Sequence, residues 1–288
     1  MQISSPIFYQ GNKFRLLKHI MPLFPKEIDT FYDLFGGSAT VSLNMIDKCK
    51  VVYNDFNTHV VELLEMFKSE DPEELDKYFN NRVLEYKLSK DIQDMEGYLK
   101  LREEYNKSKD SRDLYLLICY SICHLMRFNQ KDEFNSSKGS GQYGQKNFND
   151  IKVAHDKLQD IHILNKNIYD FDFSKITTND FVYFDPPYFG TDAVYNEGHN
   201  LDPYTKEDDY RLFKIIDDLH ESGIKFGMSN VYSTSKNANN KHLKNWAEGK
   251  YYVHHFNFIY SSFSESTIAD EVYITNVYNE THKKVELF

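Results

Sequence analysis

The residues best suited to chemistry in this chain are Asp185, Pro186 and Tyr188, which directly follow the apolar run 181–184. A carboxylate accepts hydrogen bonds, and the Pro186 peptide offers a carbonyl acceptor without an N–H donor. Two such acceptors would hold both hydrogens of an exocyclic amino group, while Tyr188 provides a flat face for a stacked base. Held in this way, the amino nitrogen regains its lone pair and could attack a methyl sulfonium placed in line. By itself the motif also fits a strand end followed by a rigid turn.

A strand must position this motif. Residues 181–184 are aromatic or β-branched, which is typical of a short buried strand. The prolines cannot continue a strand ladder, so the chain leaves the sheet at this point. We therefore expect Asp185 and Tyr188 at the carboxyl end of a strand, where open α/β sheets bind their ligands.

A nucleotide-type unit is expected near the start of the chain. A strand beginning at Thr30 leads into a turn of small residues, 36–39, and then into a helix. Small residues let a ligand approach the backbone, and a helix N-terminus offers free N–H groups. A second strand, 51–55, ends in Asp55, where Rossmann-like folds place the carboxylate that binds ribose hydroxyls. The turn lacks the full dinucleotide fingerprint, and an ordinary βαβ unit with a chance acid remains an alternative.

The middle of the chain has a different character. From residue 57 to about 165, apolar residues follow helical spacing and charges are dense, which predicts a mostly helical insertion. Its last part, 126–146, mixes glycines with Arg, Asn, Gln, Lys and aromatics. Such a segment is either a surface loop or a reader of base edges and phosphates.

The segment Gly11-Asn12-Lys13 near the start of the chain also has an ordinary interpretation. It is then a turn with a solvated lysine before an amphipathic helix.

The sheet is expected to resume after residue 165. Residues 168–173 precede the central strand, a helix covers about 206–221, and another strand covers 224–231. Two late strands, 252–260 and 271–277, are expected to form an antiparallel pair at the sheet's edge.

Composition restricts the choice of partner and compartment. The net charge of −10 opposes non-specific binding of nucleic acid, but residues 1–26 and 134–149 contain no acid and carry lysine or arginine. The three cysteines have no metal-ligand or disulfide spacing, so no metal site is expected. Without a leader pattern or an apolar run of membrane length, we expect a cytoplasmic, reducing location and no membrane partner.

Taken together, the Gly11-Asn12-Lys13 segment, the Phe35-x-Gly37-x-Ala39 turn, the insertion and Asp185-Pro186-Pro187-Tyr188 resemble the Dam family of DNA adenine-N6 methyltransferases. The order is that of the α class, most similar to the T-even phage type, and covers the chain to about Val277. The resemblance implies an α/β, Rossmann-like sheet formed by residues 1–56 and 165–288, with 57–164 as an inserted target-recognition domain.

The resemblance also implies roles for individual residues. The catalytic residues would be Asp185, Pro186 and Tyr188. The cofactor S-adenosyl-L-methionine, converted to S-adenosyl-L-homocysteine, would contact Tyr9, Lys13, Phe35, Gly37, Ala39, Asp55, Phe171 and Asp185. Double-stranded DNA with a flipped adenine would contact Arg127, Asn129, Lys138 and Tyr195.

One departure from the family concerns specificity. Family members typically have Phe-Asn-x-Pro-Phe-Gly in the recognition hairpin, whereas here Phe134-Asn135 continue into a longer loop without the Pro-Phe pair. GATC is therefore a working target. Two alternatives remain open: an RNA adenine methyltransferase, and a non-catalytic DNA-binding protein on the same scaffold. A companion restriction endonuclease and a monomeric or weakly dimeric state are further expectations.

Overall fold

The computed structural model describes residues 2–9, 11–188, 204–234, 240–261 and 266–278. The described strands form one sheet in the order β3-β2-β1-β4-β5-β7-β6. The first five are parallel, and β7 runs antiparallel to both of its neighbours. The strands are β1 (Thr30–Asp33), β2 (Lys50–Asn54), β3 (Ile161–Leu164), β4 (Phe181–Phe184), β5 (Lys225–Thr234), β6 (Tyr252–Ser261) and β7 (Ser266–Thr275).

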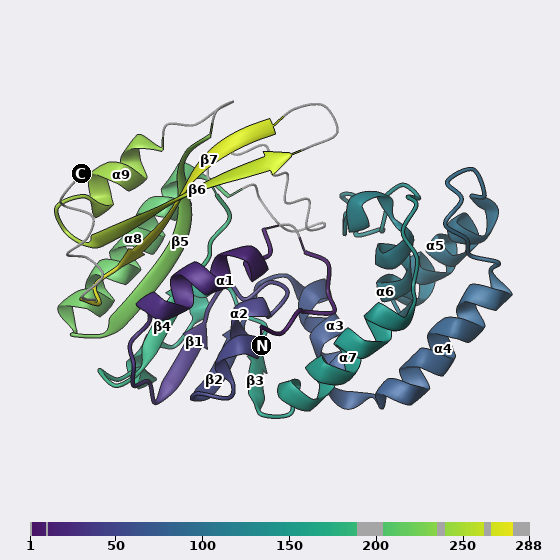
Figure 1. Cartoon of the computed structure of the whole chain (residues 1–288), viewed down its shortest axis with the longest axis horizontal. Coiled ribbons are helices and arrows are strands. Elements are labelled where there is room, and N and C mark those ends of the chain that lie inside the picture. Colours follow the sequence, from purple (N-terminus) through teal and green to yellow (C-terminus); the bar gives the residue numbers. More distant parts are fainter. Residues whose placement is uncertain (1, 10, 189–203, 235–239, 262–265, 279–288) are drawn as a thin grey trace.

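Helices cover the sheet and extend beyond it (Figure 1). They are α1 (Phe14–Ile20), α2 (Thr40–Met45), α3 (Thr58–Ser69), α4 (Pro72–Glu85), α5 (Glu96–Ser108), α6 (Ser111–Tyr120), α7 (Gln145–Leu158), α8 (Lys206–Glu221) and α9 (Lys241–Ala247). Short 3-10 helices are η1 (Met21–Leu23), η2 (Ile122–His124), η3 (Ile168–Asp170) and η4 (Phe173–Lys175). The parallel strand order 3-2-1-4-5 is that of a doubly wound, Rossmann-like sheet, so the predicted α/β fold class is confirmed.

Strand β4 shows why the sheet has two buried faces. Its side chains alternate, as strand geometry requires. Phe181 and Tyr183 pack into the core cluster shared with α1 and α2, whereas Val182 and Phe184 pack into the cluster formed with α8 and α9. All four are fully buried, which explains the uninterrupted apolar run in the sequence.

The predicted helical insertion corresponds to α3 to α7, which lie beyond β2 and β3 (Figure 1). Capping explains several helix starts: the Asn57 side chain accepts hydrogen bonds from two backbone N–H groups of α3, and Asp71 and Asp110 cap α4 and α6 in the same way. Leu117 of α6 and Leu43 of α2 belong to one core cluster, so the helices continue the core of the sheet.

Two local predictions were wrong. The sheet resumes at Ile161, within the range predicted to be helical, because β3 pairs in parallel with β2. Residues 168–170 and 173–175 form the 3-10 helices η3 and η4, because the side chains of Asn167 and Asp172 accept hydrogen bonds from nearby backbone N–H groups and so favour turns over a strand. The late antiparallel pair at the sheet's edge is confirmed as β6 and β7. Within the described parts of the chain, no helix is both long and apolar enough to cross a membrane.

Candidate active site

Three acids stand at the carboxyl ends of neighbouring parallel strands. Asp33 ends β1, Asp55 follows β2 and Asp185 follows β4. The order of the sheet reverses between β1 and β4, which is the switch point where open α/β sheets bind ligands. Asp33 and Asp55 are buried, and the Asp185 side chain is 16% exposed.

Burial dominates the electrostatics of these acids. It raises the pKa of Asp33 to about 7 and the pKa of Asp55 to about 6, and the negative charge of Asp185 adds to both increases. The pKa of Asp185 is also raised by burial, although the Lys13 ammonium opposes the increase. The site therefore has too much negative charge for its surroundings, which suits a cationic ligand.

The small-residue turn after β1 is held against Asp55. The Gly37 N–H donates to Asp55 Oδ2 at 2.7 Å, and the Asn57 N–H donates to Asp55 Oδ1 at 2.8 Å. Gly37 has a φ of +48°, and a Cβ added there would lie 3.0 Å from the Tyr9 ring. The structure thus brings together Tyr9, Gly37 and Asp55, three residues predicted to bind the cofactor.

The two other residues of this turn lie on different sides of the sheet. Ala39 is fully buried, adopts a left-handed conformation with φ 59° and occupies the N-cap position of α2. Phe35 is half-buried and packs with Phe184, with ring centroids 6.5 Å apart. Phe171 lies on the same side as Phe35 and makes an edge-to-face contact with Tyr32 at 6.2 Å.

The predicted catalytic motif is already organised. The Lys13 ammonium lies 2.7 Å from Asp185 Oδ2, and the Tyr188 hydroxyl donates to Asp185 Oδ1 at 3.1 Å. The same ammonium donates to the Gly11 carbonyl at 2.7 Å and lies 5.1 Å from the centroid of the Tyr188 ring. Pro186 is buried beside them. The residue before α1 and the residues that follow β4 therefore form one cluster.

Two acids in this region were missed from the sequence. Asp33 accepts a hydrogen bond from the Ser42 hydroxyl at 2.7 Å, while its Oδ1 is buried without a hydrogen-bond partner. Its position at the end of a strand is the signal that identified Asp55, and could have identified Asp33. Glu271, on β7, is 6% exposed and had no such signal.

A surface pocket of about 410 Å³ is lined by residues that follow β2 and β3. Some of these residues are sequence neighbours of the predicted cofactor residues. Phe56 and Asp170 line this pocket. Phe56 is 46% exposed and directly follows Asp55, and Asp170 directly precedes Phe171. Both were missed from the sequence, although each neighbours a predicted cofactor residue.

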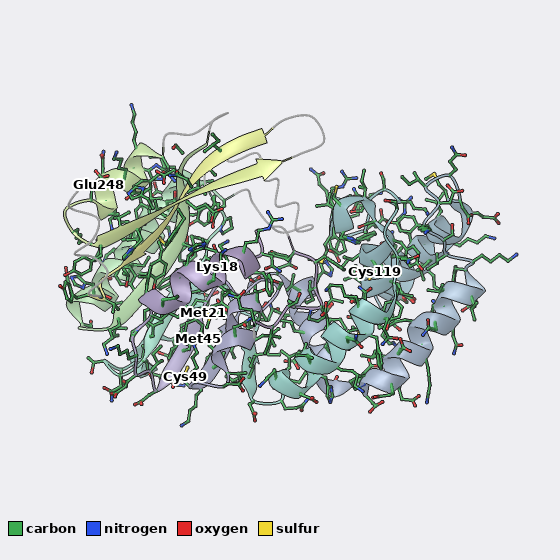
Figure 2. All side chains as sticks on the ribbon, in the orientation of Figure 1. Lys18, Met21, Met45, Cys49, Cys119 and Glu248 are labelled. Atoms are coloured by element: carbon green, nitrogen blue, oxygen red, sulfur yellow. The ribbon has the colours of Figure 1, made fainter. Side chains whose placement is uncertain are left out.

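Two of the thiols lie away from this site. Figure 2 shows Cys49 near Met45 at the lower end of the sheet, whereas Cys119 lies among the helices of the insertion. Among the described residues, no group of three or more His, Cys, Asp or Glu side chains is arranged to hold a metal ion.

The predicted DNA contacts lie in or near a hairpin. Antiparallel bridges join Phe128 to Phe134 and Ser121 to Lys138. Arg127 braces the hairpin, because its Nε and Nη2 donate to the side chain and backbone of Asn135. Tyr195 lies outside the described residues.

Two of the residues predicted to contact DNA have hydrogen-bond partners within the protein. Asn129 uses its side-chain oxygen to accept from the N–H groups of Lys131 and Glu133, which closes the turn. Lys138 is 4% exposed, and its ammonium donates to the backbone carbonyls of Ser89 and Asp91. The carbonyls of the loop between α4 and α5 already bind the charge of Lys138, so its predicted contact with DNA would require the ammonium to leave this buried position.

Comparison with known proteins identifies the family. The model of the D12 class N6 adenine-specific DNA methyltransferases matches residues 9–265. The chain belongs to the D12 class. The chain is 38% identical to the type II methyltransferase M.FokI of Planomicrobium okeanokoites and 36% identical to the modification methylase StsI of Streptococcus sanguinis, each over 97% of this chain. It is 27% identical to the DNA adenine methylase of Escherichia coli K12, over 77% of this chain and 78% of that protein.

Two of these relatives are longer than this chain. The matches cover 44% of M.FokI and 44% of StsI, so the chain spans less than half the length of either relative.

Proposed function

We propose that this D12 protein transfers the methyl group of S-adenosyl-L-methionine to N6 of an adenine in double-stranded DNA. The observation that carries the proposal is the Asp185–Tyr188 cluster at the switch point of the sheet, beside the buried acids Asp33 and Asp55. Membership of the D12 class and the similarity to the E. coli DNA adenine methylase support the same reaction.

The residues around the Gly37 turn fit this cofactor. Its sulfonium and ammonium groups are cationic, and the raised pKa values of Asp33 and Asp55 indicate a site that needs positive charge. The unpartnered Asp33 Oδ1 is an acceptor for the ammonium, and Asp55 is suited to the ribose hydroxyls. When bound, the cofactor supplies an electrophilic methyl group.

The remaining predicted cofactor contacts follow from the same placement. Gly37 leaves room for a ligand against the Tyr9 ring. Ala39, Phe35 and Phe171 would form apolar walls, and Phe56 at the neighbouring pocket offers an exposed ring beside Asp55.

Asp185 and Pro186 would position the adenine. The Asp185 carboxylate and the Pro186 carbonyl each accept one hydrogen of the amino group, which restores the lone pair of N6. As the N–C bond to the methyl group forms, the C–S bond breaks and its electron pair stays on sulfur. The methylated nitrogen then loses a proton, and Asp185, whose pKa is raised by burial, is placed to receive it.

The target adenine must leave the duplex, because its N6 is inaccessible within the base stack. Tyr188 is the described aromatic on which the flipped base would stack, and Tyr195 keeps its predicted contact with the DNA. The hairpin braced by Arg127 would read neighbouring bases, with GATC as the working target. A companion restriction endonuclease fits relatives that are named modification methylases.

Incubation of unmethylated plasmid DNA with protein and S-adenosyl-L-methionine, followed by methylation-sensitive sequencing, tests this function. Marks on adenine N6 within GATC would support both the reaction and the working target. Marks in another short motif would retain the reaction and assign a new specificity to the altered hairpin. The absence of marks, with cofactor binding intact, would reject the DNA methyltransferase.

A parallel reaction with structured RNA separates the remaining alternatives. Methyl transfer to RNA and not to DNA would favour the RNA adenine methyltransferase. DNA binding without transfer to either substrate would favour the non-catalytic protein.

A further inference from the structure

Both oxygens of Asp185 are engaged in the structure. Oδ2 is paired with the Lys13 ammonium and Oδ1 accepts from the Tyr188 hydroxyl. The proposed reaction requires Asp185 to accept a hydrogen bond from the adenine amino group. The adenine amino group would therefore compete with the Lys13 ammonium and the Tyr188 hydroxyl for the lone pairs of these two oxygens.

Lys13 cannot leave Asp185 without another anion. Its side chain is only 8% exposed, and a buried ammonium without a counter-charge is strongly unfavourable. The Gly11 carbonyl, which already accepts from this ammonium, carries no charge to replace a carboxylate. A second carboxylate near the ion pair would meet this requirement.

Glu271 is such a carboxylate, and the sheet register places it on the correct face. Glu271 pairs with Val231, and Tyr273 pairs with Ser229. The hydroxyls of Ser229 and Tyr183 are 2.6 Å apart, so Tyr273 and Tyr183 project from the same face. Glu271, two residues from Tyr273, projects from that face as well.

This is also the face that α1 covers. Tyr183, Tyr273 and Leu17 of α1 belong to one core cluster, and Lys13 immediately precedes α1. Lys13 and Asp185 therefore meet on the side of the sheet to which Glu271 points. Glu271 as a residue is 6% exposed, so water screens its charge weakly.

The charges of these groups influence one another. Burial raises the pKa of Glu271, the positive charge of Lys13 opposes that increase, and the negative charge of Asp185 adds to it. Glu271 therefore lies within electrostatic range of both members of the ion pair.

We propose that Glu271 is a positioning residue that accepts the Lys13 ammonium when adenine engages Asp185. This inference rests on the proposed function, because it concerns the step in which the adenine amino group replaces Lys13 at Oδ2. The exchange moves a cation between two buried carboxylates, so no charge enters or leaves the site. Without Glu271, Lys13 stays on Asp185 and competes with the substrate.

Glu271→Gln tests the exchange, because it removes the charge and keeps the shape. We expect kcat to fall about tenfold, which corresponds to a coupling of ~1.4 kcal/mol, while KM for S-adenosyl-L-methionine changes less than about twofold. Asp270→Asn is the matched control: Asp270 is the adjacent acid on β7, pairs with His255 and points to the opposite face. We expect wild-type kcat for this control. Wild-type kcat in Glu271→Gln would overturn the proposal.

A double-mutant cycle with Lys13→Met separates positioning from a merely structural role. If Glu271 acts through Lys13, its substitution causes no further loss of kcat in the Lys13→Met background. Losses that multiply independently would overturn the proposal.

Urea unfolding of the same four proteins gives a readout that needs no activity. We expect the two substitutions to be non-additive in the free energy of unfolding, because the two charges interact in the folded protein. Additive effects would overturn the pairing. If the wild-type protein methylates no nucleic acid while the unfolding cycle is non-additive, the proposed function fails and the Lys13–Glu271 interaction stands.

Discussion

The Lys13 ammonium lies 2.7 Å from Asp185 Oδ2, so the carboxylate proposed for catalysis is paired with a buried cation. Lys13 comes from the segment before α1, whereas Asp185 follows β4. Burial raises the pKa of Asp185, and the Lys13 ammonium opposes this increase. The same site also contains the acids Asp33 and Asp55. In the proposed mechanism, the adenine amino group competes with this cation for Asp185.

Substitution of Asp185 should remove methyl transfer and leave cofactor binding largely intact. We expect Asp185→Ala to lower kcat by at least ~10²-fold, because the amino group loses the acceptor that positions it and Lys13 loses its counter-charge. A tritiated-methyl assay measures transfer, and equilibrium dialysis measures S-adenosyl-L-methionine binding. Asp156→Asn, at an exposed acid of α7, is the control and should remain fully active. Normal transfer by Asp185→Ala would contradict the mechanism.

Gly37→Ala should weaken cofactor binding. Alanine at φ +48° costs about 1–2 kcal/mol of stability, and its methyl group would also lie 3.0 Å from the Tyr9 ring. Gly249→Ala is a matched control, because Gly249 has φ +77° with nothing within 4 Å of the added Cβ. Both variants should lose similar stability in urea, while only Gly37→Ala raises the Kd for S-adenosyl-L-methionine, by about tenfold or more. Equal Kd values for the two variants would argue against a cofactor at this turn.

Asp33→Asn should change how stability depends on pH. The pKa of Asp33 is raised from 3.8 to about 7, so the folded protein binds this proton more tightly than the unfolded chain does. The stabilisation is present below pH 3.8 and is lost as the pH rises through 7, with a slope of up to ~1.4 kcal/mol per pH unit.

Relative to wild type, Asp33→Asn should therefore gain stability between pH 5 and pH 8, by at least ~1 kcal/mol in urea unfolding without cofactor. The same variant should bind S-adenosyl-L-methionine more weakly, because the acceptor for its ammonium loses its charge. Parallel stability profiles for the two proteins would show that Asp33 does not titrate in this range.

Lys138→Met should destabilise the fold without removing a DNA contact. We expect a loss of about 2 kcal/mol, because the carbonyls of Ser89 and Asp91 lose a buried charged donor. The salt dependence of DNA affinity should stay unchanged. Lys131 is exposed in the same hairpin, so Lys131→Met should lower the free energy of unfolding by less than ~0.5 kcal/mol. If the Lys131 side chain contacts a phosphate, this substitution should lower the salt slope of DNA binding by about 1. A reduced slope for folded Lys138→Met would restore its predicted role at DNA.

Features encoded by neighbouring residues were determined by the sequence alone. The apolar run before Asp185 and the strand before Asp55 follow from local hydrophobic patterns and strand-breaking residues, and the structure has both strands. The order of the motifs along the chain was enough to indicate the family. Residues 168–173 show the limit of such patterns, because side-chain capping by Asn167 and Asp172 prevails there over apolar composition.

Features that join distant parts of the chain were decided only by the tertiary structure. The Lys13–Asp185 pair, the unpartnered oxygen of Asp33 and the approach of Glu271 depend on which strands are neighbours and which face α1 covers. The burial of Lys138 depends on loop carbonyls that lie far away in the sequence. Hydrophobic periodicity reports which side of an element is buried, but the partner of a buried charge is set by packing between elements.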